Sequence, residues 1–340
     1  MDDKSVLVHV KDDETVIVGG VAYTEYSPLP IAALGTKYIV SSCTHGEGYS
    51  SMIVIATHSQ KTVVDVAFKL EGNVTYGNKV YGDGDTLILI LDQYQTATIT
   101  TRSNITGTRI TSVETVAVFS ATYKFGNTFG NKYPLSTYEQ LHPVRLYGKE
   151  FVLAIKDDSG YRLSAQPYQL QVVSEDSDTQ IVFNDGTTIS FGETGIFRKN
   201  YNVHTNISFN TTRPVMATLC SVGSSSFGPA MDGCFLIPPV TLYLKHAYFS
   251  GRGTLQLVTA EDNHNIRVQM SQNRGSTLVN VKIAWDNVPG TRYKVGTFTS
   301  HSRQLLIIFI RSDAPFTVLG YSKARIYNTG CSLTSGGNMC

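Results

Sequence analysis

The chain has 340 residues with a formal net charge of +1, and only 16% of them are charged. This near-neutral composition argues against a nucleic-acid-binding surface, which needs a clustered excess of lysine and arginine. No apolar run approaches the roughly 20 residues that a membrane-spanning helix requires, so no membrane span is expected.

Short β-strand patterns begin at the N-terminus. Alternating apolar and polar residues, bounded by turn-forming residues, predict strands over residues 5–10, 15–19, 38–42, 52–57, 62–68 and 96–101. Residues 86–91 are continuously apolar, which predicts a strand that is buried on both faces. The one helical signal is a capping-box spacing at residues 136–139, which predicts a single turn.

The strand pattern continues in the rest of the chain. Asp185 and Gly186 lie between β-forming residues, which is the signal of a hairpin turn. Further strands are predicted over residues 256–259, 266–270, 279–285 and 294–298. Strands that recur about every 8–12 residues, with no helical period beside them, are typical of β-sandwiches and barrels.

One phrase occurs three times, at a spacing of roughly 100 residues, which indicates internal repetition. In residues 27–42, 139–155 and 235–250, a proline follows a leucine or isoleucine closely, and a short apolar step leads into an extended run. A matching closing phrase follows each copy, at residues 107–120, 205–217 and 305–319. Residues 13–19 resemble the closing phrase at 114–120, so we expect the chain to begin within a repeat.

These observations predict an all-β fold of tandem repeats, each of about 100 residues and each a β-sandwich-like unit. A propeller-like closure of the repeats is the structural alternative. The expected divisions are a partial repeat over 1–27, repeats over 28–126, 127–228 and 229–325, and a cysteine-containing tail over 326–340.

The five cysteines lack the spacing of zinc ligands. Two pairs each flank a Gly/Ser-rich loop and are disulfide candidates, Cys220 with Cys234 and Cys331 with Cys340, while Cys43 is left over. Five reduced thiols are the alternative. Four glycosylation sequons are present, at Asn73, Asn104, Asn206 and Asn210. Together these features favour an oxidising, extracellular setting, although residues 1–4 do not have the pattern of a signal peptide.

No catalytic, metal or cofactor site is predicted. The histidines do not occur at metal-binding spacings, and no G-x-S-x-G elbow is present. Acidic residues at 82–85 and 175–178 could hold Ca²⁺, but neither segment has the complete loop pattern, and solvated turns are the simpler interpretation.

Aromatic residues interrupt the polar segments 125–134 and 223–232, which are predicted to link the repeats. Exposed aromatic side chains on loops can bind partners. The binding-loop candidates are Tyr123, Phe125, Phe129, Tyr133 and Phe227. The alternative is that these rings fill the seams between repeats.

Several segments in order resemble the N-terminal domain of the IgGFc-binding protein family: 29–40, 107–120, 139–151, 214–216 and 229–240. The resemblance covers residues 5–325 and implies a secreted, non-enzymatic binding or adhesion module of a mucus- or matrix-type protein. Its expected partners are extracellular glycoproteins or glycans. A carbohydrate-binding, lectin-like module is the alternative, and a glycoside-active enzyme is a more distant one.

Overall fold

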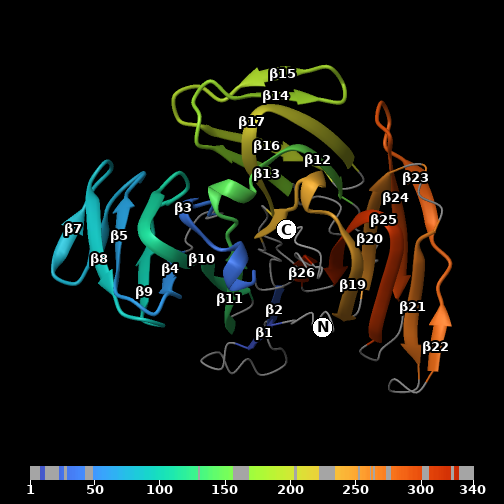
Figure 1. The fold of residues 1–340 in the computed structure, drawn as a ribbon, viewed down its shortest axis with the longest axis horizontal. Coiled ribbons are helices and arrows are strands. Elements are labelled where there is room, and N and C mark those ends of the chain that lie inside the picture. The colour runs from blue at the N-terminus through green and yellow to red at the C-terminus, as the bar shows by residue number, and fades with distance from the viewer. Residues whose placement is uncertain are drawn as a thin grey trace.

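The fold is all-β, with three largely antiparallel sheets placed around a common centre (Figure 1). This computed structural model describes residues 8–11, 23–26, 29–42, 49–128, 131–155, 168–202, 205–221, 234–251, 253–260, 262, 265–272, 277–300, 306–322 and 325–328. The predicted all-β repeats are therefore confirmed, and each repeat forms one curled, sandwich-like sheet.

The first sheet has the strand order β8-β5-β10-β4-β9, with β3 and β11 also paired to β10. Its strands are β3 (Gly35–Ile39), β4 (Tyr49–Ala56), β5 (Thr62–Ala67), β8 (Thr86–Leu91), β9 (Thr96–Thr101), β10 (Arg109–Thr128) and β11 (Asn131–Gln140). A separate hairpin of β6 (Val74–Tyr76) and β7 (Lys79–Tyr81) lies beside it.

The second sheet repeats this arrangement, with the order β15-β14-β17-β13-β16 and with β12 and β18 paired to β17. Its strands are β12 (Gly148–Ile155), β13 (Tyr168–Ser174), β14 (Gln180–Phe183), β15 (Thr188–Ser190), β16 (Ile196–Tyr201), β17 (Thr205–Ser221) and β18 (Cys234–Ile237). The predicted hairpin at 183–187 is confirmed, because β14 pairs with β15 and Gly186 has a φ of 84°.

The third sheet is built around β25, which pairs with β19, β20, β21 and β26. Its strands are β19 (Leu244–Gly251), β20 (Gly253–Ala260), β21 (Arg267–Gln272), β22 (Thr277–Asn280), β23 (Ala284–Asn287), β24 (Tyr293–Ser300), β25 (Leu306–Ser322) and β26 (Arg325–Asn328). The N-terminal strands β1 (Val8–Lys11) and β2 (Tyr23–Tyr26) form an antiparallel pair, and β2 extends this sheet through a parallel contact with β26. Segments from the two ends of the chain therefore lie side by side.

One long strand organises each sheet: β10, β17 or β25. The pairing of β10 with β3 shifts register between Thr111 and Val116, and the corresponding strand pairs of the other sheets shift at the same relative place. An irregularity of this kind bends a strand and increases its twist. Each long strand can therefore pair with different neighbours along its length, which curls the sheet around its own apolar core.

The repeated sequence phrase forms the centre of the molecule. Each copy makes one 3-10 turn after a proline: η1 (Ile31–Ala33), η2 (Val144–Leu146) and η3 (Val240–Leu242). The φ angles of Pro30, Pro143 and Pro239 lie between −66° and −64°, as the proline ring requires. Residues from all three copies pack into one apolar cluster: Leu29, Ala33, Leu34, Ala117, Leu146, Leu242 and Leu244.

Glycine allows neighbouring copies of the turn to approach closely. A Cβ atom at Gly35 would lie 2.6 Å from Cβ of Pro143, and one at Gly148 would overlap Pro239. The prolines of the second and third turns thus pack on the glycine that follows the preceding turn. At the corresponding position of the third copy stands Leu244, which belongs to the central cluster.

Two local predictions were wrong. Residues 136–139 do not form a helical turn, because they lie in β11, whose pairing with β10 provides the backbone hydrogen bonds. The helical turn comes later, at Val144–Leu146. The strand at 86–91 is buried on one face only, since Ile88 and Ile90 are 64% and 61% exposed. The predicted strand at 15–19 lies outside the described residues.

Candidate functional site

A buried polar network joins the first sheet to the second. Gln171 on β13 is 1% exposed, and its Nε2 donates hydrogen bonds to Ser41 Oγ at 2.6 Å and to the Ser42 carbonyl at 3.3 Å. Ser41 Oγ also lies 2.7 Å from Thr218 Oγ1 on β17. Buried amides and hydroxyls need such partners, so this network holds the two sheets at one seam.

Arg198 on β16 extends the network to the surface. Its Nε donates a 2.7 Å hydrogen bond to Gln171 Oε1, while the side chain itself remains accessible to solvent. Neighbouring protein atoms disfavour the charged form and lower the pKa of Arg198, and the Glu71 carboxylate opposes this by favouring the charge. The guanidinium is therefore oriented by a buried residue and presented at the mouth of the seam.

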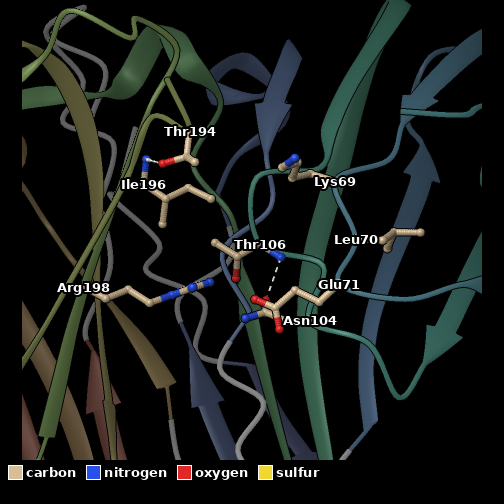
Figure 2. A pocket seen from close by; sticks show the side chains of 8 residues that line it. All are labelled: Lys69, Leu70, Glu71, Asn104, Thr106, Thr194, Ile196 and Arg198. Atoms are coloured by element: carbon tan, nitrogen blue, oxygen red, sulfur yellow. Dashed lines mark hydrogen bonds between the residues drawn. The ribbon is translucent and has the colours of Figure 1, made fainter. Parts of the chain in front are cut away.

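A cleft of about 260 Å³ lies at this mouth, between the two sheets (Figure 2). It is lined by Lys69, Leu70, Glu71, Asn104, Thr106, Thr194, Ile196 and Arg198. Figure 2 shows Arg198 pointing from the second sheet toward Thr106 and Asn104 of the first. A second hollow of about 320 Å³ shares Lys69, Thr194 and Ile196 with the cleft and adds Arg109 and Glu193.

Internal contacts fix the first-sheet side of the cleft. Asn104 Oδ1 accepts a 2.9 Å hydrogen bond from the Thr106 backbone N–H, and Thr106 Oγ1 donates to the Ser42 carbonyl at 2.8 Å. Lys69 Nζ lies 2.9 Å from Asp83 Oδ2. The pKa of Asp83 lies below its usual value. The larger cause is the hydrogen bond from the Leu70 backbone N–H, and the second is the contact with Lys69.

Two glycines shape the walls of the cleft, one between the sheets and one within the second sheet. Gly107 has a φ of +93°, and a Cβ atom there would lie 2.9 Å from Cδ1 of Ile196 on the opposite wall. Gly195 has a φ of +63°, and a Cβ there would lie 2.8 Å from the Ser174 carbonyl oxygen. Left-handed backbone of this kind favours glycine, so both positions depend on the missing side chain.

The predicted cysteine site lies at the far end of β17. Cys220 is buried and disulfide-bonded, and Cys234 is its cross-strand neighbour in the pairing of β17 with β18. That register supports the predicted pairing of these two residues, which stays a prediction. Cys43, Cys331 and Cys340 lie outside the described residues.

The four sequon asparagines differ in accessibility. Asn73, in the turn before β6, and Asn210, on β17, are exposed, whereas Asn104 and Asn206 are half-buried. Asn104 lines the cleft, and the Thr106 of its sequon is buried. Glycosylation of the four residues stays a prediction.

The aromatic candidates are not on a loop where the structure describes them. Tyr123 and Phe125 lie on β10 and Tyr133 lies on β11, within one antiparallel hairpin. The predicted boundary between residues 126 and 127 falls inside the same hairpin. Phe129 and Phe227 lie outside the described residues, so binding by these rings remains a prediction.

The acidic turns use their carboxylates internally. Asp85 Oδ2 accepts a 2.7 Å hydrogen bond from the Gly82 N–H, and Asp178 forms a 3.0 Å ion pair with Arg213. Among the residues that the structure describes, no three His, Cys, Asp or Glu side chains gather as a metal site would require. Both segments are therefore explained as structured turns.

Sequence reasoning missed Lys69, Glu71 and Arg198 as site residues. They come from separate segments of two repeats, and only folding brings them together. The one cleft residue among the candidates was Asn104, which was singled out as a sequon.

No helix within the described part of the chain is long and apolar enough to span a membrane.

Fold and cleft together define an all-β protein of three repeated sheets, with a polar surface cleft at one seam. The chain belongs to the IgGFc binding protein family, whose family model matches residues 25–322. The human IgGFc-binding protein is 28% identical over 159 residues, which cover 46% of this chain and 3% of the human protein. The chain thus corresponds to a small part of that relative. No solved structure matches it.

Proposed function

We propose that this chain is a secreted, non-enzymatic binding or adhesion module of a mucus- or matrix-type protein, and that it binds other glycoproteins. Membership in a family described as IgGFc binding protein supports a binding role. The disulfide-bonded Cys220 supports an oxidising, extracellular compartment, where disulfides persist.

The observation that carries the proposal is the cleft between the first and second sheets. It presents a guanidinium, an amide and a carboxylate, from Arg198, Asn104 and Glu71, on a scaffold that the buried Gln171 network holds together. Recognition sites gain affinity when their polar groups are held in position before the partner arrives. Such a cleft suits a polar partner, either a protein surface or a glycan.

A lectin-like module is the second candidate, favoured by the composition of the same cleft. Sugar hydroxyls donate to carboxylates and accept from amide and guanidinium groups, and these groups line the cleft beside the apolar Ile196. A glycoside-active enzyme is the third candidate. It would need two suitably placed carboxylates, and turnover of chromogenic glycosides that is lost in Glu71→Gln would support it.

Direct binding to purified glycoproteins tests the proposal. The chain, expressed through a secretory pathway, is immobilised, and a mucin and an IgG Fc fragment are passed over it before and after enzymatic deglycosylation. Binding that survives deglycosylation supports protein recognition, and binding that is lost supports the lectin-like candidate. No binding to either glycoprotein would overturn the proposal.

A pair of variants on one strand connects the binding to the cleft. Arg198→Ala removes the guanidinium from the cleft, and we expect it to weaken binding about tenfold or more. Lys199→Ala is the control, because Lys199 is the next residue on β16 and lies over the rings of Phe183 and Tyr201, outside the cleft. Equal binding by the two variants would show that the partner is bound elsewhere.

A further inference from the structure

We infer that the cleft between the first and second sheets binds a carboxylate-bearing sugar, such as the acidic residue at the end of a glycan chain. The inference rests on the proposed binding function and names the ligand class of that site. Arg198, Asn104 and Glu71 are the residues that would recognise the sugar (Figure 2).

Arg198 supplies the site for the sugar carboxylate. Its Nε is bound to Gln171 Oε1 at 2.7 Å, and no ion pair or hydrogen bond of the described residues engages its two terminal nitrogens. The charge of Lys69, by contrast, is already paired with Asp83 at 2.9 Å. A positioned guanidinium with free N–H groups matches the bidentate geometry of a carboxylate.

Asn104 and Glu71 supply complementary groups for the sugar ring. Because Asn104 Oδ1 already accepts from the Thr106 N–H at 2.9 Å, its amide nitrogen remains to donate to a ring substituent. The Glu71 carboxylate accepts from hydroxyl groups. A ligand with one anionic group and several hydroxyls satisfies all three residues, whereas a neutral sugar offers the guanidinium no carboxylate for a bidentate contact. A volume of about 260 Å³ suits a single sugar ring.

The third sheet provides an internal comparison. The cross-strand pair Gln171 and Arg198 corresponds to Gln256 and Thr297, which face each other in the pairing of β20 with β24. No arginine is present at that position, and within the described residues neither Gln256 amide atom has a hydrogen-bond partner. The guanidinium is therefore a feature of the first seam and not a general consequence of the repeat.

The test uses free sugars with the full chain. N-acetylneuraminic acid and glucuronic acid are the acidic probes, galactose is the neutral probe, and acetate is the bare carboxylate. Saturation-transfer NMR and calorimetric titration report binding. We expect both acidic sugars to bind at least tenfold more tightly than galactose and acetate. Equal binding of galactose or acetate would overturn the inference.

Asn104→Asp is the decisive variant. It keeps the Oδ1 acceptor for Thr106 but replaces the amide nitrogen with a charged oxygen, so we expect acidic sugars to bind at least tenfold more weakly. Asn73→Asp makes the same change in an exposed turn outside the cleft and should leave binding unchanged. Equal binding by the two variants would overturn the inference.

Two further measurements separate the possible failures. If Asn104→Asp does not fold, Arg198→Lys provides the test. Lysine keeps the positive charge but lacks the paired N–H donors of the guanidinium, so acidic-sugar binding should again fall about tenfold. Glycoprotein capture that is unaffected by Asn104→Asp and by sialidase treatment would overturn the inference and leave the proposed function intact. Acidic-sugar binding without capture of any glycoprotein would overturn the proposed function alone.

Discussion

Arg198 and Gln171 face each other on neighbouring strands, and Arg198 Nε donates a 2.7 Å hydrogen bond to Gln171 Oε1. The corresponding pair in the third sheet, Thr297 and Gln256, has buried polar atoms without a partner in the described residues. The seam between the second and third sheets instead contains an apolar cluster of Val152, Ala154, Val258, Val288, Tyr293 and Val295, and the Tyr293 hydroxyl donates a 2.7 Å hydrogen bond to Glu150 Oε1. The two seams thus use different interactions at equivalent places.

Leucine substitutions should therefore have opposite effects at the two glutamines. Gln171→Leu removes the hydrogen-bond partner of Arg198 Nε and one of the two partners of Ser41 Oγ, and we expect it to lower the free energy of unfolding by about 2–4 kcal/mol. Gln256→Leu removes an unpartnered amide and should be neutral or stabilise the protein by about 1 kcal/mol. Urea denaturation measures both, and equal losses would contradict the assignment of the two seams.

Glu139 should make the protein less stable as the pH rises. Burial raises its pKa to about 8, and a hydrogen bond from the Leu236 backbone opposes the shift. The pKa of Glu139 is higher in the folded state than in the unfolded state. Its contribution to the free energy of unfolding is therefore fully present below about pH 4.5 and is lost as the pH rises to about 8. Glu139→Gln should remove this loss and stabilise the protein by roughly 2–4 kcal/mol at pH 8.

Denaturation at pH 7 and pH 8.5 isolates the Glu139 effect. Burial lowers the pKa of His142 to about 4, so this neighbour is neutral in the folded state above pH 7 and only weakly charged in the unfolded state. Below about pH 6.5 it acts in the opposite direction, because the unfolded state binds its proton first. An unchanged pH dependence in Glu139→Gln would refute the raised pKa of the Glu139 carboxyl.

Gly148→Ala tests the contact between the central turns. The added methyl group would overlap Pro239, with its Cγ at 2.7 Å, and neither the proline ring nor the backbone can move freely. We expect a loss of about 1–3 kcal/mol, as for other overpacked cores. Gly82→Ala is the control, because its nearest neighbour would be 3.5 Å away. Thermal unfolding compares the two, and a neutral Gly148→Ala would contradict the packing described.

Adjacent residues of β8 should differ sharply in their tolerance of substitution. Leu89→Ala removes a buried side chain and should cost about 2–5 kcal/mol. Ile90→Thr changes an exposed residue and should alter stability by about 0.5 kcal/mol or less. Chemical denaturation measures both variants. A large decrease in the free energy of unfolding for Ile90→Thr would instead support burial of both faces of this strand.

Glycosylation should separate Asn73 from Asn104. Asn73 lies exposed in a turn, while Asn104 is engaged with Thr106 inside the cleft, where an attached glycan would occupy the binding space. We expect mass-spectrometric peptide mapping of the secreted chain to find glycan at Asn73 and unmodified Asn104. A modified Asn104 would be incompatible with a cleft that is open to an external sugar.

Local physical chemistry made the repeats readable from the sequence alone. Proline sets one backbone angle, so the phrases around Pro30, Pro143 and Pro239 form equivalent turns, and an alternating pattern over residues 96–101 coincides with β9. The Asp-Gly turn at 185–186 likewise depends on local features, namely the positive φ of Gly186 and the hydrogen bond from the Thr187 N–H to Asp185 Oδ1. The family resemblance came from these same segments.

Tertiary structure alone decided the site and the exceptions. The strand pairing of β11 outweighed the capping-box signal at 136–139, because a ten-residue strand gains many more hydrogen bonds than a single turn. The exposure of Ile90 depended on which face of the sheet is covered. The cleft joins Glu71, Asn104 and Arg198 from two repeats, and no local pattern records which distant side chains meet when two sheets pack together.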